Sequence, residues 1–238
     1  VADNTIVMYS TDNGPHYNTW PDAAITPFRS EKNTNWEGGF RVPAMVRWPG
    51  RIQEGQVINE IMSHEDWVPT LMAAAGRPNV VAELKAGVTV DGKPYKNHLD
   101  GYNFLHLLEG ETDLGPRNSF FYWSDDGVLT AIRTGDWKVV FAEQRAQGFA
   151  VWREQFDELR IPKVFHLRRD PFERADVHAD NYEDWWVRKV PPRIAVARIE
   201  LQKFLTTLAQ FPPRQRPATF GVDQMMEPLY NQQKSQGQ

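Results

Sequence analysis

The chain has 238 residues, of which 41% are hydrophobic and 12% aromatic, so it is too apolar for a disordered tail or linker and long enough for one or two domains. Its net charge of −4 argues against a general nucleic-acid binder, and no apolar run reaches the roughly 18–20 residues of a membrane helix. The absence of Cys excludes disulfides, thiolate metal sites and a cysteine nucleophile.

The chain opens with neither an initiator Met nor a signal-peptide pattern, and it leads directly into a predicted strand over residues 5–10. We therefore expect it to begin inside a larger protein. The apolar residues of this strand are not separated by polar ones, which is typical of a strand buried on both faces, as in a parallel sheet. A polar turn, Thr-Asp-Asn-Gly-Pro, follows at 11–15, and a polar loop spans 16–39. A second strand is predicted at 44–48.

One helix is predicted at 63–76. With Asp66 as its N-cap, Pro69 occupies the third helical position, where the missing N–H has no intrahelical acceptor to lose. Residues 77–98 are expected to form a loop, and a short helical turn is expected at 103–108.

The sequence changes character near Pro116, after which apolar runs alternate with turn residues. Four runs predict a small antiparallel sheet: 120–123, 129–132, 137–141 and 164–167. A helix is predicted at 193–210, because apolar residues recur along one face: Ile194, Ala197, Leu201, Phe204, Leu205 and Leu208. We expect the aromatic run at 120–123 to pack against this helix.

These elements predict an α/β protein in two parts. Residues 1–115 are interpreted as the C-terminal part of an α/β domain, and residues 116–238 as a small α+β subdomain with one antiparallel sheet, the helix 193–210 and a polar tail from residue 214. Two strands do not form a stable parallel sheet alone, so we expect the rest of the first sheet to come from elsewhere.

Candidate chemistry lies directly after the first strand, because ligands of open α/β sheets bind past the carboxyl ends of the strands. The carboxylate of Asp12 and the amide oxygen of Asn13 are hard donors that suit Ca²⁺ or Mg²⁺. Ordinary turn chemistry is the alternative for these residues. A loop that places Lys32 near Asp12 would bring an ammonium to an anionic ligand, and a solvated surface lysine is the alternative there.

The order of six segments resembles the C-terminal portion of the formylglycine-dependent (type I) sulfatases, which include the arylsulfatases and belong to the alkaline-phosphatase-like superfamily. The most specific segment is 27–50, with Pro-Phe-Arg, Lys, Trp-Glu-Gly-Gly, Arg-Val-Pro and Trp-Pro-Gly in that order. The other segments are 5–15, 63–76, 100–108, 133–138 and 167–173.

The resemblance implies the C-terminal part of an alkaline-phosphatase-like α/β/α domain and the hydrolysis of sulfuric esters. It also implies that Asp12 and Asn13 are ligands of an active-site Ca²⁺, and that Lys32 holds a sulfate oxygen. A divalent cation and an ammonium stabilise the charge that moves to the leaving oxygen as the S–O bond breaks. The family commonly has Gly on both sides of this Lys, whereas this chain has Glu31 and Asn33.

The family's nucleophile is a formylglycine made from Cys or Ser within Cys/Ser-x-Pro-x-Arg, and this motif is absent from residues 1–238. An Asp-Asp pair of metal ligands, a second Lys and two His also lie upstream in the family. We therefore expect the formylglycine upstream of this chain and the missing N-terminal half of the same protein as a partner. Residues 1–238 alone are expected to hydrolyse no sulfate ester, and the implied substrate is a sulfated small molecule or glycan.

Two histidines near this site have open roles. His16 follows Asn13 by three residues and is a candidate substrate-binding residue, with a structural role as the alternative. His64 is a candidate contact to the leaving group, with a structural or capping role as the alternative. Glu37 and Arg41 are expected to hold the Lys32 loop by charge-assisted hydrogen bonds.

Two other functions compete with the sulfatase. One is a phosphonate monoester hydrolase or phosphodiesterase of the same superfamily, which shares the metal platform. The other is a non-catalytic glycan-binding module.

Overall fold

The computed structural model describes residues 1–19 and 25–213, so the predicted polar tail lies outside the described residues. The strands of this part form three antiparallel sheets: β1 (Val7–Ser10) with β2 (Ala44–Arg47), β3 (Val88–Val90) with β4 (Lys93–Tyr95), and β5 (Ser119–Trp123), β6 (Leu129–Thr134), β7 (Trp137–Glu143) and β8 (Asp157–His166) in that order. The α-helices are α1 (Glu37–Phe40), α2 (Trp67–Ala74), α3 (Val80–Ala86), α4 (Leu105–Leu108), α5 (Ala175–His178), α6 (Tyr182–Lys189) and α7 (Pro191–Gln210).

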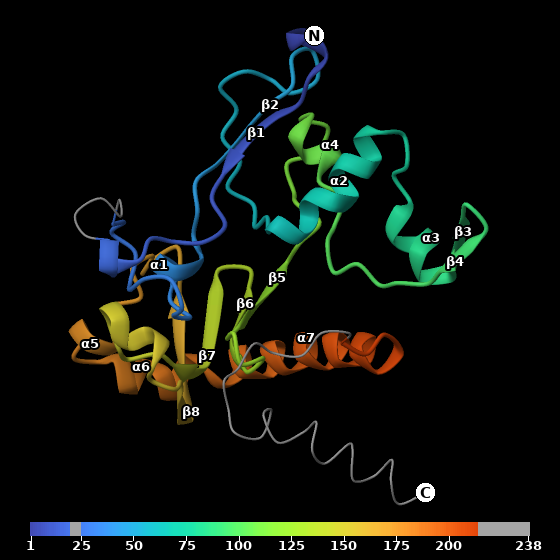
Figure 1. Ribbon diagram of the computed structural model, residues 1–238. Coiled ribbons are helices and arrows are strands. Elements are labelled where there is room, and N and C mark those ends of the chain that lie inside the picture. Colours follow the sequence, from blue (N-terminus) through green and yellow to red (C-terminus); the bar gives the residue numbers. More distant parts are fainter. Residues whose placement is uncertain (20–24, 214–238) are drawn as a thin grey trace, which may run out of the picture.

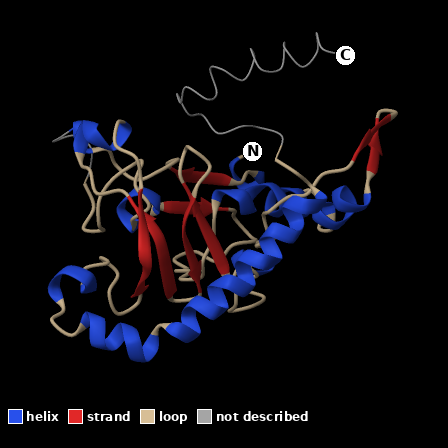
Figure 2. Cartoon of the chain, turned by 90° about the horizontal axis from the view of Figure 1, so that it is seen from below, coloured by secondary structure: helices blue, strands red, loops and turns tan. Residues whose placement is uncertain are grey.

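The four-stranded sheet is the centre of the molecule, and it confirms the antiparallel sheet expected from the sequence. Helix α7 runs across one face of this sheet (Figures 1 and 2). Neighbouring residues of a strand point to opposite faces, so Ala131 and Ile132 of β6 belong to two different clusters of buried side chains. Both residues are fully buried, which shows that the sheet is covered on both sides.

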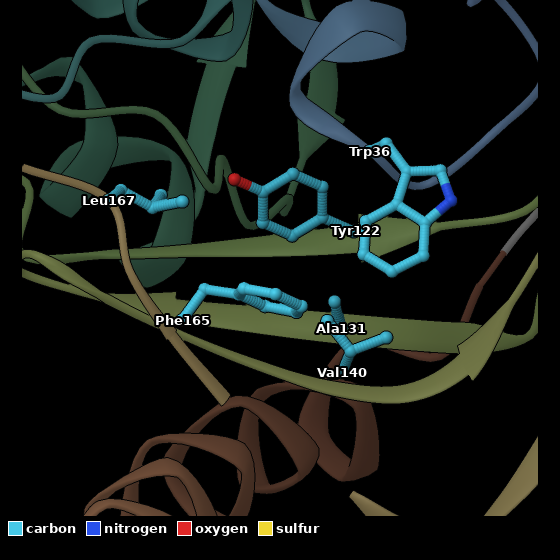
Figure 3. Packing of buried hydrophobic residues seen from close by; sticks show 6 residues of the cluster. All are labelled: Trp36, Tyr122, Ala131, Val140, Phe165 and Leu167. Atoms are coloured by element: carbon cyan, nitrogen blue, oxygen red, sulfur yellow. The ribbon is translucent and has the colours of Figure 1, made fainter. Parts of the chain in front are cut away.

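Each face of the sheet has its own core. Ile132, Val139 and Val164 pack with Ala197 of α7, as the amphipathic pattern predicts. On the opposite face, Trp36 of the segment before α1 packs with residues of the sheet and the segment after β8: Tyr122, Ala131, Val140, Phe165 and Leu167 (Figure 3). The expected packing of run 120–123 against α7 holds for alternate residues, because Phe121 and Trp123 contact Phe204 whereas Phe120 and Tyr122 contact Phe40.

The expected parallel pairing of the first two strands is wrong, whereas burial of the first strand on both faces, which needs strands from outside this chain, stays a prediction. Strand β1 pairs with β2 in antiparallel register, from Val7 opposite Arg47 to Ser10 opposite Ala44. Met8 and Tyr9 are 46% and 60% exposed. An apolar run specifies neither the direction of the neighbouring strand nor what covers its faces, and the described residues leave this strand open to solvent.

The loop predicted at 77–98 is also wrong, because this segment contains α3 and the β3–β4 hairpin. Asp91 and Gly92 form the two-residue turn, both with positive φ (49° and 76°), as Asp-Gly hairpin turns require. The strands on either side are only three residues long, too short to show a periodic pattern. Figure 2 shows this hairpin at one end of the molecule.

Helix α2 begins as the sequence predicts, with Asp66 as its N-cap and Pro69 at the third helical position. Asp66 also links distant segments, because its buried carboxylate accepts hydrogen bonds from the Ser63 and Tyr102 backbone N–H groups at 2.8 and 2.7 Å. Arg117 donates to both carboxylate oxygens, at 2.9 and 2.7 Å. Asp66 therefore connects α2 to the start of the sheet subdomain.

No helix within the described ranges has the length and apolarity required to cross a bilayer.

A buried ionic network joins α1 to the four-stranded sheet. The Lys138 Nζ atom of β7 lies 3.1 Å from Glu37 and 2.7 Å from Glu173, and all three side chains are almost fully buried. Glu37 also accepts hydrogen bonds from the Tyr122 hydroxyl at 2.7 Å and from Arg41 at 2.6 Å. The Glu37 backbone N–H donates to Glu173 at 2.7 Å, which closes the network.

The shared lysine affects the two carboxylates differently. Burial raises the pKa of Glu37, but Lys138, Arg41 and the Tyr122 hydrogen bond outweigh it and lower that pKa to about 2. Burial raises the pKa of Glu173 above its ordinary value, and the negative charge of Glu37 adds to this effect. The network thus holds one firmly ionised carboxylate next to a second that ionises less readily.

We expect Lys138→Met to destabilise the protein by about 3–5 kcal/mol, because removing one partner leaves buried carboxylates without their cation. Chemical denaturation of the complete protein measures this change. The control is Arg188→Met, which breaks an exposed ion pair with Asp184 and is expected to cost less than about 1 kcal/mol. Equal destabilisation by the two variants would show that the network does not hold the fold together.

The low pKa of Glu37 predicts acid sensitivity. A carboxyl whose folded pKa is depressed contributes stability that is fully present above its ordinary pKa of 4.5 and is lost as the pH falls toward its folded pKa of about 2. The difference in unfolding free energy between the complete protein and its Glu37→Gln variant should therefore shrink on acidification through that window. A difference that stays constant with pH would contradict this prediction.

Candidate functional site

The turn that follows β1 is held against α1 by backbone contact. The Gly14 N–H donates to the Gly39 carbonyl at 2.9 Å. A Cβ atom on Gly14 would lie 1.7 Å from the Gly38 carbonyl oxygen, so no larger residue fits without moving the backbone. Packing against α1 therefore requires the glycine of the Asp-Asn-Gly sequence, in addition to any preference of these residues for turns.

A second backbone contact brings the Lys32 loop to the same turn. The Lys32 N–H donates to the Pro15 carbonyl at 2.8 Å. The same broad open concavity is lined by Asp12, Asn13, His16, Lys32 and His64, together with many other residues.

The two residues predicted as metal ligands both line this concavity and carry oxygen donors. Asp12 is exposed, and its Oδ1 accepts a hydrogen bond of 3.4 Å from the Thr11 hydroxyl. The Asn13 Nδ2 donates to the Gly14 carbonyl at 2.8 Å, which leaves the Oδ1 atom of the amide as its acceptor for a ligand. Calcium takes six to eight oxygen ligands, so these two side chains fit part of a site. Across the described ranges, no three or more His, Cys, Asp or Glu residues form a metal-binding cluster.

His64 lies beside this turn, with its Nε2 atom 2.9 Å from the Thr11 carbonyl oxygen. The ring therefore contacts the segment that carries Asp12. This contact holds the turn after β1 in place, which agrees with a structural role for His64.

The residues on either side of Lys32 fix its loop. The carboxylate of Glu31 is fully buried and accepts hydrogen bonds from the Tyr17 and Gly148 backbone N–H groups, each at 2.6 Å. Asn33 has a φ of 62° and donates from its Nδ2 atom to the Val151 carbonyl at 2.6 Å. Asn tolerates this left-handed conformation better than most residues, so the loop keeps a glycine-like backbone at position 33.

Sequence reasoning missed Trp152, which lies far along the chain from Lys32 and carries no motif. Its Nε1–H donates to His16 Nε2 at 2.6 Å, so that nitrogen of His16 acts as an acceptor. Lys32 Nζ lies 5.9 Å from the centroid of the Trp152 ring. Only the folded chain brings these residues together, because Trp152 belongs to a loop between β7 and β8.

Glu37 and Arg41 were expected to hold the Lys32 loop. They form an ion pair with each other at 2.6 Å. The other side-chain partners of Glu37 are Lys138 and Tyr122 of the sheet, so these contacts anchor α1 to the sheet rather than to the Lys32 loop.

Comparison with known proteins gives two family matches. Residues 1–77 match the model described as Sulfatase, and residues 115–235 match the model described as C-terminal region of aryl-sulfatase. An arylsulfatase of Hemicentrotus pulcherrimus is 33% identical over 208 residues, which cover 77% of this chain and 34% of that protein. The human N-acetylgalactosamine-6-sulfatase is 32% identical over 194 residues, which cover 73% of this chain and 34% of that protein.

A solved structure supports the same assignment. The PsFucS1 sulfatase from Pseudoalteromonas sp. superposes with a TM-score of 0.70 at 26% identity, covering 90% of this chain and 39% of that one. The chain spans about a third of the length of the curated relatives it matches. Because the two family models together match most of its residues, the chain belongs to the sulfatase family, within the alkaline-phosphatase-like superfamily.

Proposed function

We propose that this chain supplies part of the active site of a sulfate ester hydrolase. In this proposal Asp12 and Asn13 are ligands of a Ca²⁺ ion, and Lys32 binds an oxygen of the substrate's sulfate group. The observation that carries the proposal is the hydrogen bond from the Lys32 N–H to the Pro15 carbonyl, which holds the lysine loop against the turn of the two oxygen donors. The relatives support it, because they are named as sulfatases.

The chemistry follows from charge. A sulfate ester is an anion, and negative charge moves to the leaving oxygen as the S–O bond breaks. When bound, a divalent cation would supply positive charge that stabilises this negative charge. Lys32 adds an ammonium, and the backbone of its loop is held in place by Glu31 and Asn33. The donor oxygens of Asp12 and Asn13 also suit Mg²⁺, which is the second candidate ion.

The nucleophile of the proposed reaction lies outside residues 1–238. The chain has no Cys and no Ser-x-Pro-x-Arg motif, which the family uses to make formylglycine. We therefore propose that a formylglycine and the remaining metal ligands come from the rest of the same protein. The exposed apolar residues of the β1–β2 pair, such as Tyr9 and Met45 at 60% exposed each, give that part a surface to pack on.

Two kinds of substrate are suggested by the relatives' names. One relative is an arylsulfatase and another an N-acetylgalactosamine-6-sulfatase. Aryl sulfates and sulfated sugars are therefore the two substrate classes to be tested first.

Substitutions of Asp12 and Lys32 are expected to have separable effects in the complete protein. Asp12→Asn removes a charged ligand, so calcium affinity should fall at least ~10-fold and activity should fall with it. Lys32→Ala should lower kcat by ~10²–10³-fold with the calcium content unchanged, because it removes only a contact to the sulfate.

Metal analysis and kinetics on an aryl sulfate make this measurement, and Asp91→Asn in the β3–β4 turn is the matched control. Normal calcium content in Asp12→Asn would refute its assignment as a ligand. Calcium loss in Lys32→Ala would show that this lysine is structural.

We expect residues 1–238 alone to release no nitrophenol from 4-nitrophenyl sulfate, because the chain lacks the nucleophile motif. The complete protein serves as the positive control in the same assay. Sustained turnover by the purified chain, abolished by Lys32→Ala, would mean that residues 1–238 contain a different nucleophile.

A further inference from the structure

The loop that carries Trp152 is tied to the lysine loop on both sides of Lys32. The carboxylate of Glu31 accepts the Gly148 N–H, and the amide of Asn33 donates to the Val151 carbonyl, each at 2.6 Å. Gly148 and Trp152 are the first and last residues of a short 3-10 helix, and Val151 within it is buried. The two residues that replace the family's glycines therefore fix the position of Trp152 relative to Lys32.

The indole of Trp152 is oriented but not covered. Its Nε1–H donates a hydrogen bond to His16 Nε2 at 2.6 Å, and the two rings meet edge-on with centroids 5.6 Å apart. The side chain is nevertheless 46% exposed, and it lines the same concavity as Lys32. A large aromatic side chain whose polar edge is satisfied and whose ring is left open offers apolar area to a ligand at little cost in side-chain entropy.

The distances place this ring next to the group that would carry the sulfate. An ammonium binds an anionic oxygen at about 2.7–2.9 Å. The Lys32 Nζ atom lies 5.9 Å from the centroid of the Trp152 ring. When the ester oxygen of a sulfate held by Lys32 points toward Trp152, the ring of the leaving group comes close enough to contact the indole.

The surroundings of the indole favour a sugar over a flat apolar group. Trp152 is bordered by the imidazole of His16 and the ammonium of Lys32, which are polar groups at the edge of an apolar surface. A pyranose has the matching character, with C–H bonds on its face and hydroxyl groups around its rim. Ligand sites of this kind combine an aromatic wall with a few polar groups that fix orientation.

We propose that Trp152 is the stacking residue of a sugar subsite beside Lys32, and that Asn33 positions it through the tether to Val151. The substrate class is then a sulfated pyranose, whose ring packs on the indole while its sulfate contacts Lys32. This inference rests on the proposed function, since it needs a sulfate at Lys32.

The test uses steady-state kinetics of the complete protein on N-acetylgalactosamine 6-sulfate, N-acetylglucosamine 6-sulfate and 4-nitrophenyl sulfate, with inorganic sulfate as a competitive inhibitor. Trp152→Ala should raise KM for the preferred sulfated sugar about 3–10-fold, with little change in kcat. Trp152→Phe should recover most of this loss, because it restores a ring. The inhibition constant of inorganic sulfate should not change, because sulfate alone does not reach the indole.

Two further variants separate stacking from general disturbance. Phe149→Ala is the matched control, because Phe149 lies on the same 3-10 helix and is 62% exposed but does not line the concavity. It should leave every constant unchanged. Asn33→Gly keeps a residue that accepts the positive φ but removes the tether, so it should raise KM for the sugar in the same direction as Trp152→Ala.

The outcomes distinguish the two proposals. Activity on 4-nitrophenyl sulfate without activity on either sugar would overturn the sugar subsite, and so would an unchanged sugar KM in Trp152→Ala. A rise in the sulfate inhibition constant equal to the rise in KM would show that Trp152 only supports Lys32. An unchanged KM in Asn33→Gly would refute the positioning role. A complete protein that neither hydrolyses a sulfate ester nor binds sulfate would instead refute the proposed function.

Discussion

The site depends on how closely two backbones approach each other. Gly14 lies so near Gly38 that a single added carbon would overlap the carbonyl oxygen. This contact, with the hydrogen bond from Gly14 to Gly39, sets the position of the turn that carries Asp12 and Asn13. The lysine loop then joins the same turn through Pro15, so the backbone that carries the candidate donors and the backbone of Lys32 are held together.

Helix α1, which contacts this turn, is itself held by a buried network of charged side chains. Glu37 begins α1, directly before the two glycines, and its carboxylate is bound to Lys138 of the central sheet. Two buried carboxylates and one lysine are costly to remove from water, and their hydrogen bonds offset that cost only in one arrangement. The network therefore defines where α1 lies on the sheet, and the loss of one partner is costly because it leaves the others buried without their counter-charge.

Part of this arrangement follows from the sequence and part does not. The apolar runs separated by turn residues predict the four-stranded sheet, and the apolar face that begins at Ile194 predicts α7. The β3–β4 hairpin was missed because its strands are too short to show a period. The antiparallel pairing of β1 with β2 was missed because an apolar run does not specify the direction of the neighbouring strand. The placement of Asp12 near Lys32 came from family resemblance, whereas Trp152 had no local signal and was found only in the fold.

The central claim is that the turn after β1 and the Lys32 loop together hold a cation and a sulfate. A crystal structure of the complete protein with calcium and inorganic sulfate tests it most directly. The account predicts a calcium ion bound by a carboxylate oxygen of Asp12 and the amide oxygen of Asn13, with a sulfate oxygen at hydrogen-bond distance from Lys32 Nζ. Calcium bound elsewhere with Asp12 in solvent, or a sulfate that does not contact Lys32, would contradict it.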